Sequence, residues 1–499
     1  MRRVSFRVSL ACAVAACLWA CLLAPPASAD TALNSGTTTV STGTNFGSNL
    51  HVATTGTATL QVIAGGYATN SIGYLGFNAG SVGTATVSSG TWANSSTLTV
   101  GSGSGSSGTL SVDGGSVTNS IGYLGNNAGS VGTATVSGGT WANSGDLYVG
   151  YSGTGTLNVT GGSVNSSTGY LGYYAGSHGR VTVSSGTLAN SGNLTVSRSG
   201  TGTLTMTGGL VSVSGTLSQG THRTINLNSG GTLQIGVGGT TGVLGVAALT
   251  NNGTLIFNRS DASTYSGVLS GSGAVTKQAA GLLTLAGANS YSGRTTISAG
   301  TVALSGTGSI GTGGLNLGTT GSPGVFDLLG LTAGSYSLPS SASLAGVGTN
   351  SGSGKSLTVL GSLAPGNSAG TITVCSGLSL DLSLSGSSVF EITSPAFTAG
   401  TFDLISGDGS VVFGGILNLA FSGGSYADGT DVLQLFANTG GRSGNFSVVN
   451  ATGLAAGQSA TFNSATGFIT VVPEPSTCCM ALAGLACGGY SMFRRRKRD

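Results

Sequence analysis

The chain has 499 residues, of which 92 are glycine and only 6% are charged, and its formal net charge is +3. Its basic residues gather at the two ends, because residues 30–472 carry eight basic and eleven acidic residues. This distribution excludes a cationic nucleic-acid-binding face on the body of the protein, and we expect no nucleic-acid partner. Cys375 is the single cysteine of that stretch, so no disulfide can form within it.

Residues 1–29 have the three parts of a secretory signal peptide. Basic residues precede a long apolar stretch, and Ala27-Ser28-Ala29 stands directly before Asp30. Small residues at these positions are typical of a cleavage site in an exported protein. We therefore expect Ala27 and Ala29 to mark the cleavage site and the mature chain to begin at Asp30. The alternatives are a retained N-terminal anchor and a lipoprotein signal, in which Val14-Ala15-Ala16 precedes Cys17.

A repeat follows the signal peptide. The phrase GYLGFNAGSVGTATVSSGTWANS at 73–95 returns at 122–144 and, with changes, at 169–191, and LTVGSGSGSSGTLSVDGGSVTNS at 98–120 fits the same frame. The units begin at Leu50, Gly73, Leu98, Gly122, Leu147, Gly169 and Leu194. A period of about 24 residues is typical of solenoids, and the unit has room for three short strands, the cross-section of a β-helix. A propeller blade would need about 40 residues.

The repeat also predicts how the coil is packed. The units that open at Gly73 and Gly122 carry a tryptophan near their end, and those that open at Leu98 and Leu147 carry a valine there. The unit that opens at Gly169 departs from this pattern, with Leu188. Because close-packed interiors conserve volume, we expect Trp92 to lie over Gly73 and Trp141 over Gly122. An inward asparagine column is expected to form a hydrogen-bonded ladder along the stack. Its members are Asn70, Asn94, Asn119, Asn143, Asn165 and Asn190.

A column of tyrosines follows the residues that open the repeat units, at positions whose side chains we expect to point out of the coil. Its members are Tyr74, Tyr123, Tyr148 and Tyr170. Exposed aromatic rings are candidate contacts for a glycan, and the alternative is a ladder of like side chains that stabilises the sheet. A flat array of Thr-x-Thr units would instead favour ice binding. Thr84-Ala85-Thr86 and Thr133-Ala134-Thr135 fit such an array, whereas Thr109-Leu110-Ser111 and Thr156-Leu157-Asn158 are predicted to interrupt it.

Two stretches resemble known repeats. Residues 47–215 resemble the repeat shared by autotransporter passengers and PEP-CTERM proteins. Residues 251–304 resemble the autotransporter-associated β-strand repeat, whose G-x-L-T-L-x-G-x-N-x-Y-S-G core stands here as Gly281 to Gly293. The resemblance implies a right-handed parallel β-helix. An autotransporter ends in a membrane barrel of alternating strands, and this chain ends in an arginine-rich tail, so we do not expect self-translocation.

Residues 345–472 lose the period but keep a β-like composition. Six acidic residues and no basic residue occur over 381–431, and a calcium site around Asp428 and Asp431 is the alternative to solvated turns. Ca²⁺ takes six to eight oxygen ligands, and no EF-hand spacing occurs here, so we expect turns and no metal. The charged residues are scattered and the histidines lie far apart, so we expect no enzyme, no catalytic residues and no cofactor.

The C-terminal residues have the pattern of a membrane-targeting segment. Pro473-Glu474-Pro475 precedes an uncharged apolar run at 477–493, whose length is near the lower limit for a helix that spans a bilayer. A stop cluster of positive residues follows, consisting of Arg494, Arg495, Arg496, Lys497 and Arg498. By itself this pattern predicts a C-terminal transmembrane helix as a tail anchor, with the positive cluster on the cytoplasmic side. Over positions 473–499 the chain resembles the PEP-CTERM sorting signal of Gram-negative bacteria. That resemblance implies an exosortase, a transpeptidase-like membrane enzyme that cuts near Pro-Glu-Pro and releases the body.

These observations together predict an all-β protein. We expect a signal peptide (1–29), a solenoid of about seven repeats (30–235), an autotransporter-associated repeat region (236–344), a smaller β-rich region (345–472) and a sorting signal with a transmembrane helix (473–499). The predicted function is that of a non-enzymatic surface or matrix protein, exported through the inner membrane. An exosortase-type enzyme and an extracellular polysaccharide are its candidate partners. A carbohydrate-binding adhesin and an ice-binding protein are the alternatives.

Overall fold

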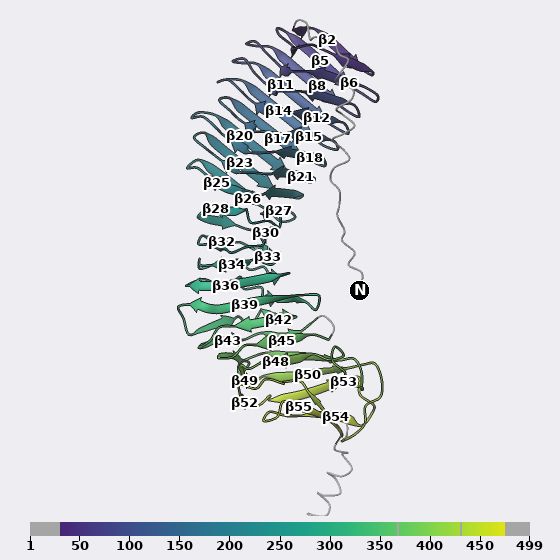
Figure 1. Cartoon of the computed structure of the whole chain (residues 1–499), viewed down its shortest axis with the longest axis vertical. Helices are drawn as coiled ribbons and strands as arrows, with labels where there is room; N and C mark the ends of the chain where they lie inside the picture. Colours follow the sequence, from purple (N-terminus) through teal and green to yellow (C-terminus); the bar gives the residue numbers. More distant parts are fainter. Residues whose placement is uncertain (1–29, 367–368, 430–431, 475–499) are drawn as a thin grey trace, which may run out of the picture. The chain divides into compact units, whose positions relative to one another are not determined.

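The computed structural model describes residues 30–366, 369–429 and 432–474. These residues form strands and turns, and none of them is helical (Figure 1). None of the described segments is a helix of the length and hydropathy needed to span a membrane. The predicted signal peptide and the apolar run at 477–493 lie outside the described residues.

The described residues fall into two compact units. The first comprises residues up to Thr182 together with Val196–Thr203 and Gly220–Arg223, and the second comprises the others. Four strands have residues in both units, namely β20 (His178–Val183), β22 (Leu194–Val196), β23 (Thr201–Met206) and β26 (Arg223–Leu227).

The first unit consists of three parallel sheets, and the chain visits them in turn. The first sheet contains β1 (Thr31–Leu33), β4 (Asn49–Val52), β7 (Ile72–Leu75), β10 (Thr97–Val100), β13 (Ile121–Leu124), β16 (Leu147–Val149) and β19 (Gly169–Leu171). The second contains β2 (Gly36–Val40), β5 (Thr57–Val62), β8 (Val82–Val87), β11 (Ser107–Val112), β14 (Val131–Val136) and β17 (Thr154–Val159). The third contains β3 (Gly43–Asn45), β6 (Tyr67–Asn70), β9 (Thr91–Asn94), β12 (Ser116–Asn119), β15 (Thr140–Asn143) and β18 (Ser163–Ser166). Because each strand pairs with the strand one repeat later, the predicted parallel solenoid is confirmed.

The register follows the predicted columns. Leu50 pairs with Gly73, and Gly73 pairs in turn with Leu98. Val52 and Leu75 form the second inward column and are fully buried. Side chains alternate between the core and the surface along each strand, as a two-residue period requires. The core of the first unit is therefore a stack of aliphatic columns.

The volume relationship between glycine and tryptophan is confirmed. A Cβ atom added to Gly73 would lie 2.9 Å from Cζ2 of Trp92, and one added to Gly122 would lie 3.1 Å from Cζ2 of Trp141. Both indole rings are fully buried. The Gly73 position would also meet Leu98 Cδ1 at 3.1 Å, so the leucine of the next coil leans over the glycine. The space left by the glycine is therefore occupied both by the tryptophan of the same coil and by the leucine of the next coil.

The asparagine column forms bonded pairs in place of the continuous ladder expected from the sequence. Asn70 Nδ2 donates to Asn94 Oδ1 at 2.7 Å, and Trp92 Nε1 donates to Asn70 Oδ1 at the same distance. Asn94 Nδ2 then turns to the carbonyl of Thr118, at 3.4 Å. The indole takes the acceptor that a further asparagine would have used, so the ladder is divided at each tryptophan.

Asn165 does not belong to this column. In β18 it stands beside Ala142 on the outward parity, and Ser166 is the buried residue at the end of the strand. The sequence alignment shifted this unit by one residue. Asn119 and Asn143 repeat the paired arrangement, with Nδ2 of Asn119 2.6 Å from Oδ1 of Asn143.

The second unit is also built from parallel ladders. Its longest sheet contains β21 (Thr187–Asn190), β24 (Leu210–Val213), β27 (Thr232–Ile235), β30 (Thr254–Asn258), β33 (Ala274–Gln278), β35 (Thr295–Ile297), β37 (Leu315–Asn316), β41 (Ser343–Gly346), β44 (Ser362–Pro365), β47 (Ser387–Ile392), β50 (Ile416–Phe421) and β53 (Val448–Thr452). Asn190 is buried at the end of β21.

Other sheets complete the coils of the second unit. One contains β31 (Ser263–Tyr265), β34 (Leu282–Leu285), β36 (Gly300–Gly306), β39 (Ser322–Leu331), β42 (Gly348–Ser351), β45 (Thr371–Val374) and β48 (Leu404–Ser406), with β38 (Gly318–Thr319) antiparallel to β39. Another contains β40 (Ser335–Leu338), β43 (Lys355–Val359), β46 (Leu378–Asp381), β49 (Ser410–Phe413) and β52 (Arg442–Gly444). Two strand pairs join β25 (Thr216–Gln219) to β28 (Val243–Gly245) and β29 (Ala248–Thr250) to β32 (Val268–Ser270).

Parallel pairing continues beyond residue 344, where the sequence period is lost. Ile372 pairs with Ile405 and Asn418 pairs with Asn450, so these coils are longer than those of the first unit and differ from each other in length. Longer and unequal loops hide the period while the strands stay in register. The unit ends in an antiparallel sheet of β51 (Val432–Gln434), β54 (Gln458–Asn463) and β55 (Phe468–Pro473).

Candidate functional site: a surface cluster of tyrosines

A row of aromatic side chains follows the outward face of the first sheet. Tyr123 on β13 pairs with Tyr148 on β16, and Tyr148 pairs with Tyr170 on β19. Their rings are stacked, with centroids 5.0 Å apart and planes within 9° of parallel. The sequence prediction that these residues stand outside the coil is confirmed, because each is half-buried beside a buried neighbour.

A second set of tyrosines was missed from the sequence. Tyr151 and Tyr173 follow Gly150 and Gly172, whose φ angles of 73° and 67° turn the chain toward the same face. Tyr173 is stacked on Tyr151 at 5.1 Å. The signal was present as the change from GFNAG at 76–80 to GYYAG at 172–176. We call Tyr123, Tyr148, Tyr151, Tyr170, Tyr173 and Tyr174 the tyrosine cluster.

Tyr174 lies at the rim of the tyrosine cluster and is 48% exposed. Its ring meets those of Tyr151 and Tyr173 edge to face, at 5.0 and 4.9 Å. The Arg198 guanidinium carbon lies 4.2 Å from the Tyr173 ring centroid, a cation–π contact. The cluster therefore offers one exposed ring, several hydroxyls and one cation.

Stacking within the cluster limits what it can bind. Both faces of Tyr148 are covered, by Tyr123 and by Tyr170. A sugar ring cannot stack on a face that another ring occupies, so the inner tyrosines present edges and hydroxyls. Aromatic pairs at this separation stabilise a protein beyond their buried area, by about 0.5–1.5 kcal/mol each. The inner rings of the tyrosine cluster thus stabilise the sheet, and only the rim of the cluster is open to ligands.

Asp146 and the phenols of the cluster interact directly. Tyr148 Oη donates to Asp146 Oδ2 at 3.0 Å, and Tyr151 Oη donates to Tyr174 Oη at 3.5 Å. Burial and this carboxylate hold the pKa of Tyr148 far above its usual range. The bond to Tyr174 raises the pKa of Tyr151 to about 12. These phenols stay protonated at any physiological pH.

Tyr74 belongs to a separate group with His51 and Phe77. The imidazole of His51 is stacked on the Tyr74 ring at 4.9 Å, and Phe77 meets both rings edge to face. His51 Nε2 lies 3.8 Å from Asp30 Oδ2, yet burial lowers the pKa of His51. Thr99 separates this group from Tyr123 in the register. Of the four tyrosines predicted as glycan contacts, Tyr74 therefore stands apart, whereas Tyr123, Tyr148 and Tyr170 lie together.

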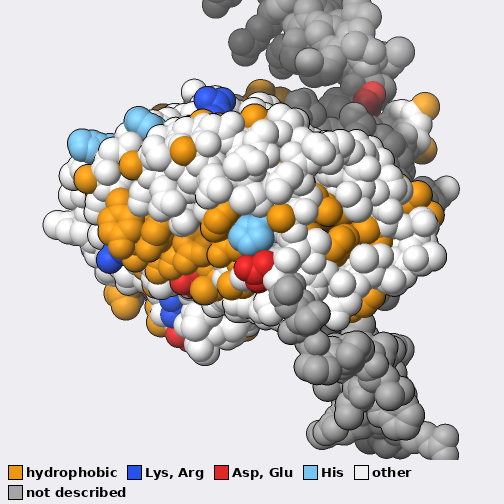
Figure 2. Space-filling view, turned by 90° about the horizontal axis from the view of Figure 1, so that it is seen from above, with side chains coloured by type: hydrophobic (Ala, Val, Ile, Leu, Met, Phe, Trp, Pro, Cys, Tyr) orange, Lys and Arg blue, Asp and Glu red, His pale blue; other side chains and the backbone are white. Residues whose placement is uncertain are grey.

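Figure 2, which looks onto the end that carries β2, shows hydrophobic side chains gathered together and charged ones scattered.

An unbroken row of threonines follows the outward face of the second sheet. In register these are Thr37, Thr59, Thr84, Thr109, Thr133 and Thr156. The interruption expected from the sequence affects only the next row, in which Thr86 and Thr135 alternate with Gln61, Ser111 and Asn158. One complete row and one interrupted row therefore lie side by side.

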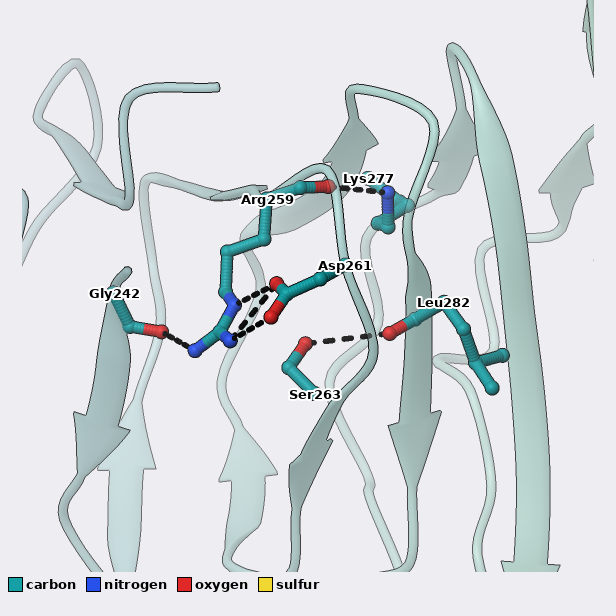
Figure 3. Close-up of polar contacts among 6 residues, drawn as sticks. All are labelled: Gly242, Arg259, Asp261, Ser263, Lys277 and Leu282. Carbon is teal, nitrogen blue, oxygen red and sulfur yellow. Dashed lines mark hydrogen bonds and ion pairs between the residues drawn. The ribbon is translucent and has the colours of Figure 1, made fainter. Parts of the chain in front are cut away.

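The second unit holds a buried cation and an ion pair (Figure 3). Lys277, 1% exposed, donates from Nζ to the carbonyls of Gln278 at 2.6 Å and Ala279 at 2.8 Å. Burial lowers the pKa of Lys277 to about 8. Arg259 binds both carboxylate oxygens of Asp261 and the carbonyl of Gly242. Fixed carbonyls and a paired carboxylate satisfy these cations, so the arrangement is that of a structural core.

A cavity of about 80 Å³ adjoins this group and is lined by Arg259, Phe257, Tyr265 and their neighbours. Tyr265 is 3% exposed, and burial raises its pKa to about 12. Among residues 30–366, 369–429 and 432–474, no three His, Cys, Asp or Glu side chains group as metal ligands. Asp428 accepts a hydrogen bond from Gln458 Nε2 at 2.9 Å. Asp431 lies outside the described residues.

Part of the predicted sorting motif belongs to the folded body. Pro473 is the last residue of β55 and pairs with Gln458 of β54. The Glu474 amide donates to the Gly457 carbonyl at 2.6 Å. Pro475, the stop cluster at 494–498 and the cleavage residues Ala27 and Ala29 lie outside the described residues. The first two residues of the motif, Pro473 and Glu474, are therefore held by the antiparallel sheet at the end of the described residues.

Two stretches of the chain are similar to known proteins. Residues 275–304, from β33 to β36, match the family model of the passenger-associated-transport-repeat. The chain is also 42% identical over 74 residues to the adhesin BmaC autotransporter of Brucella suis biovar 1 (strain 1330). The matched stretch covers 15% of this chain and only 2% of the adhesin. The chain therefore carries autotransporter-type repeats within a parallel β-solenoid.

Proposed function

We propose that this protein is a non-enzymatic surface or matrix protein of a Gram-negative bacterium, exported through the inner membrane and sorted by a PEP-CTERM tail. Its solenoid is right-handed, the hand that parallel crossover connections favour. The main support for a surface role is the parallel solenoid of autotransporter-type repeats, a stack of coils with a repetitive surface. The similarity to an autotransporter adhesin supports surface exposure.

An exosortase-type enzyme is the proposed processing partner. The folded body reaches Glu474, so the apolar run from Thr477 would hold Pro475 at the membrane surface. The positive cluster would stop export and set the orientation of this single-pass segment in the precursor. Cleavage near Pro475 would then release the body to the envelope, the surface or the extracellular matrix.

Replacement of Pro473, Glu474 and Pro475 by alanine tests the sorting. The alanine at 474 keeps the amide that donates to Gly457, so the folded body should retain its urea midpoint. The uncut chain should then accumulate in the inner membrane and the surface pool should fall. Unchanged processing, with an unchanged urea midpoint, would refute sorting by this motif. A matched variant with glutamine at 494–498 should instead disturb orientation.

A carbohydrate-binding adhesin is the second candidate. The observation in its favour is the tyrosine cluster, with Tyr174 exposed and Arg198 beside Tyr173. Because the inner rings cover one another, contact would use the Tyr174 ring and the phenol hydroxyls. Binding of the full chain to a glycan array, lost in Tyr174→Ala and kept in Tyr67→Ala, would support this role. No bound glycan, or equal loss in both variants, would refute it.

Ice binding is the third candidate and rests on the threonine row. Six threonines in register provide regularly spaced hydroxyl and methyl groups along one face. Strands in a sheet are about 4.8 Å apart, so the row repeats at that spacing. Thermal hysteresis that disappears in Thr84→Leu with Thr109→Leu would support the role. Absence of hysteresis in the unmodified chain would refute it.

A further inference from the structure

The tyrosine cluster is continuous from its half-buried end to its exposed rim. Successive rings are in contact with centroid separations of 4.9 to 5.1 Å, from Tyr123 through Tyr148 and Tyr151 to Tyr174. Tyr174 is the exposed ring of the six. Aromatic packing accounts for the stack, but it does not by itself require a tyrosine exposed at the rim.

We propose that Tyr174 is an oxidative cross-linking site, at which two copies of the chain become joined by a carbon–carbon bond between their tyrosine rings. The co-reactant is a peroxide used by a peroxidase-type one-electron oxidant. This chemistry does not depend on how the protein is exported or sorted. Its product would be a covalently joined pair of solenoids.

Coupling of two tyrosine rings removes two electrons and two protons from the pair of chains. Each of two phenols loses one electron and one proton and becomes a phenoxyl radical. The two radicals join through ring carbons adjacent to the oxygen-bearing carbon, and the two hydrogens displaced from those carbons move to the oxygens, which restores both phenols. The pair of chains has lost two hydrogen atoms in total. One hydrogen peroxide accepts the two electrons and two protons and becomes two water molecules.

Four contacts favour oxidation within the cluster and coupling at its rim. The Asp146 carboxylate accepts the Tyr148 phenol proton at 3.0 Å, so that proton has a nearby base when the ring loses an electron. Rings in contact allow an electron to pass from Tyr174 through Tyr151 to the oxidised Tyr148. Tyr148 then regains its proton from Asp146, and the exposed phenol of Tyr174 releases its own proton to solvent. The Arg198 cation over Tyr173 disfavours further positive charge on that ring. The radical can therefore settle at Tyr174.

Access then decides which ring couples. Formation of a bond between two chains requires that both rings come within bonding distance, and Tyr174 is 48% exposed. Tyr148 is enclosed by Tyr123 and Tyr170 and cannot meet a ring of another copy face to face. Tyr67 is a matched comparison for exposure, because its side chain is 44% exposed. It lies on β6, outside the tyrosine cluster, and its strand partners Gly43 and Thr91 are not aromatic.

The experiment treats the purified full chain with a peroxidase and hydrogen peroxide. Covalent dimers are measured on denaturing gels, and cross-linked peptides by mass spectrometry. The chain should form dimers whose linked peptides both contain Tyr174 and lack two hydrogens. Tyr174→Phe should lose most of the dimer, whereas Tyr67→Phe should keep it. An unchanged urea midpoint in each variant shows that the fold is retained.

Tyr148→Phe separates the cluster from simple exposure. This variant keeps the ring stack and the exposure of Tyr174 but removes the phenol that is bonded to Asp146. Dimer formation at Tyr174 should fall several-fold. The proposal is overturned if Tyr67 couples as often as Tyr174, if Tyr148→Phe has no effect, or if the link joins only Tyr151 and Tyr174 of one chain.

Discussion

The indole of Trp92 fills much of the space that a side chain at position 73 would need, because a Cβ atom on Gly73 would lie 2.9 Å from Cζ2 of the ring and closer still to Oδ1 of Asn94. One strand later in the first sheet, Leu98 pairs with Gly73, and one strand later in the third sheet, Val117 pairs with Trp92. The chain thus alternates a glycine–tryptophan coil with a leucine–valine coil of similar core volume. Complementary volume specifies which residues may follow one another in the stack.

Replacement of Gly73 by leucine should therefore overpack the coil. We expect a loss of about 1–3 kcal/mol. The double variant Gly73→Leu with Trp92→Val should recover part of that loss, because it reproduces the Leu98–Val117 combination. Recovery is incomplete because Trp92 no longer donates to Asn70, and because Oδ1 of Asn94 and Cδ1 of Leu98 remain close to position 73. Urea unfolding followed by circular dichroism measures both variants. A double variant as unstable as the sum of the single variants would contradict the facing arrangement.

Asn94→Ala should destabilise the first unit, because it removes the acceptor of the buried Asn70 amide. A buried donor left without a partner costs about 1–3 kcal/mol. Asn165→Ala is the matched control, since that side chain stands on the outward parity, and it should change the urea midpoint little. Equal effects of the two substitutions would show that the inward pairing has no energetic role.

The buried ammonium of Lys277 should make stability depend on pH. Its pKa in the fold is about 8, below the value of 10.5 for an exposed lysine, so the unfolded chain binds more protons between these values. Its contribution to stability is therefore fully present above about 10.5 and is lost as pH falls toward 8, at up to about 1.4 kcal/mol per pH unit. Urea midpoints measured from pH 7 to 10.5 should rise relative to those of Lys277→Met. Parallel curves for the two proteins would contradict the shift.

Asp403 should make stability fall as pH rises, the opposite of the effect of Lys277, and it should do so at lower pH. Burial raises its pKa to about 7 from 3.8, although the amides of Gly370 and Glu391 donate to its two carboxylate oxygens. The folded chain binds more protons between these values, so this contribution is complete below about pH 4 and is lost as pH rises through 7. The stability difference between wild type and Asp403→Asn should shift against wild type over this interval. A difference that does not vary with pH would mean that Asp403 titrates normally.

Much of the fold could be predicted from the sequence because the repeat keeps side-chain parity over successive coils. Leu50, Gly73 and Leu98 share a register that the spacing alone revealed. Asn165 was misplaced because its unit is shorter, and alignment by residue type preferred asparagine over Ser166. The coils beyond residue 344 were not recognised, because their ladders persist while their loops vary in length.

The candidate site could be predicted only in part. Tyr123, Tyr148 and Tyr170 follow from parity, whereas Tyr151, Tyr173 and Tyr174 depend on turns at Gly150 and Gly172 that bring them to the same face. The stacking that covers the faces of Tyr148 depends on side-chain conformation, which no spacing rule supplies. Parity thus identified the sheet that carries the cluster, and the turns determined its composition.

Mass spectrometry of native surface material tests the central claim, that the body is exported and then separated from its tail. We predict that the mature chain begins at Asp30 and that its C-terminal peptide ends near Pro475, a few residues after the end of β55. Peptides from both units should be recovered from the same surface fraction. Intact peptides that run from the body through Phe493 would contradict release of the body and would leave a retained membrane anchor as the explanation of the tail.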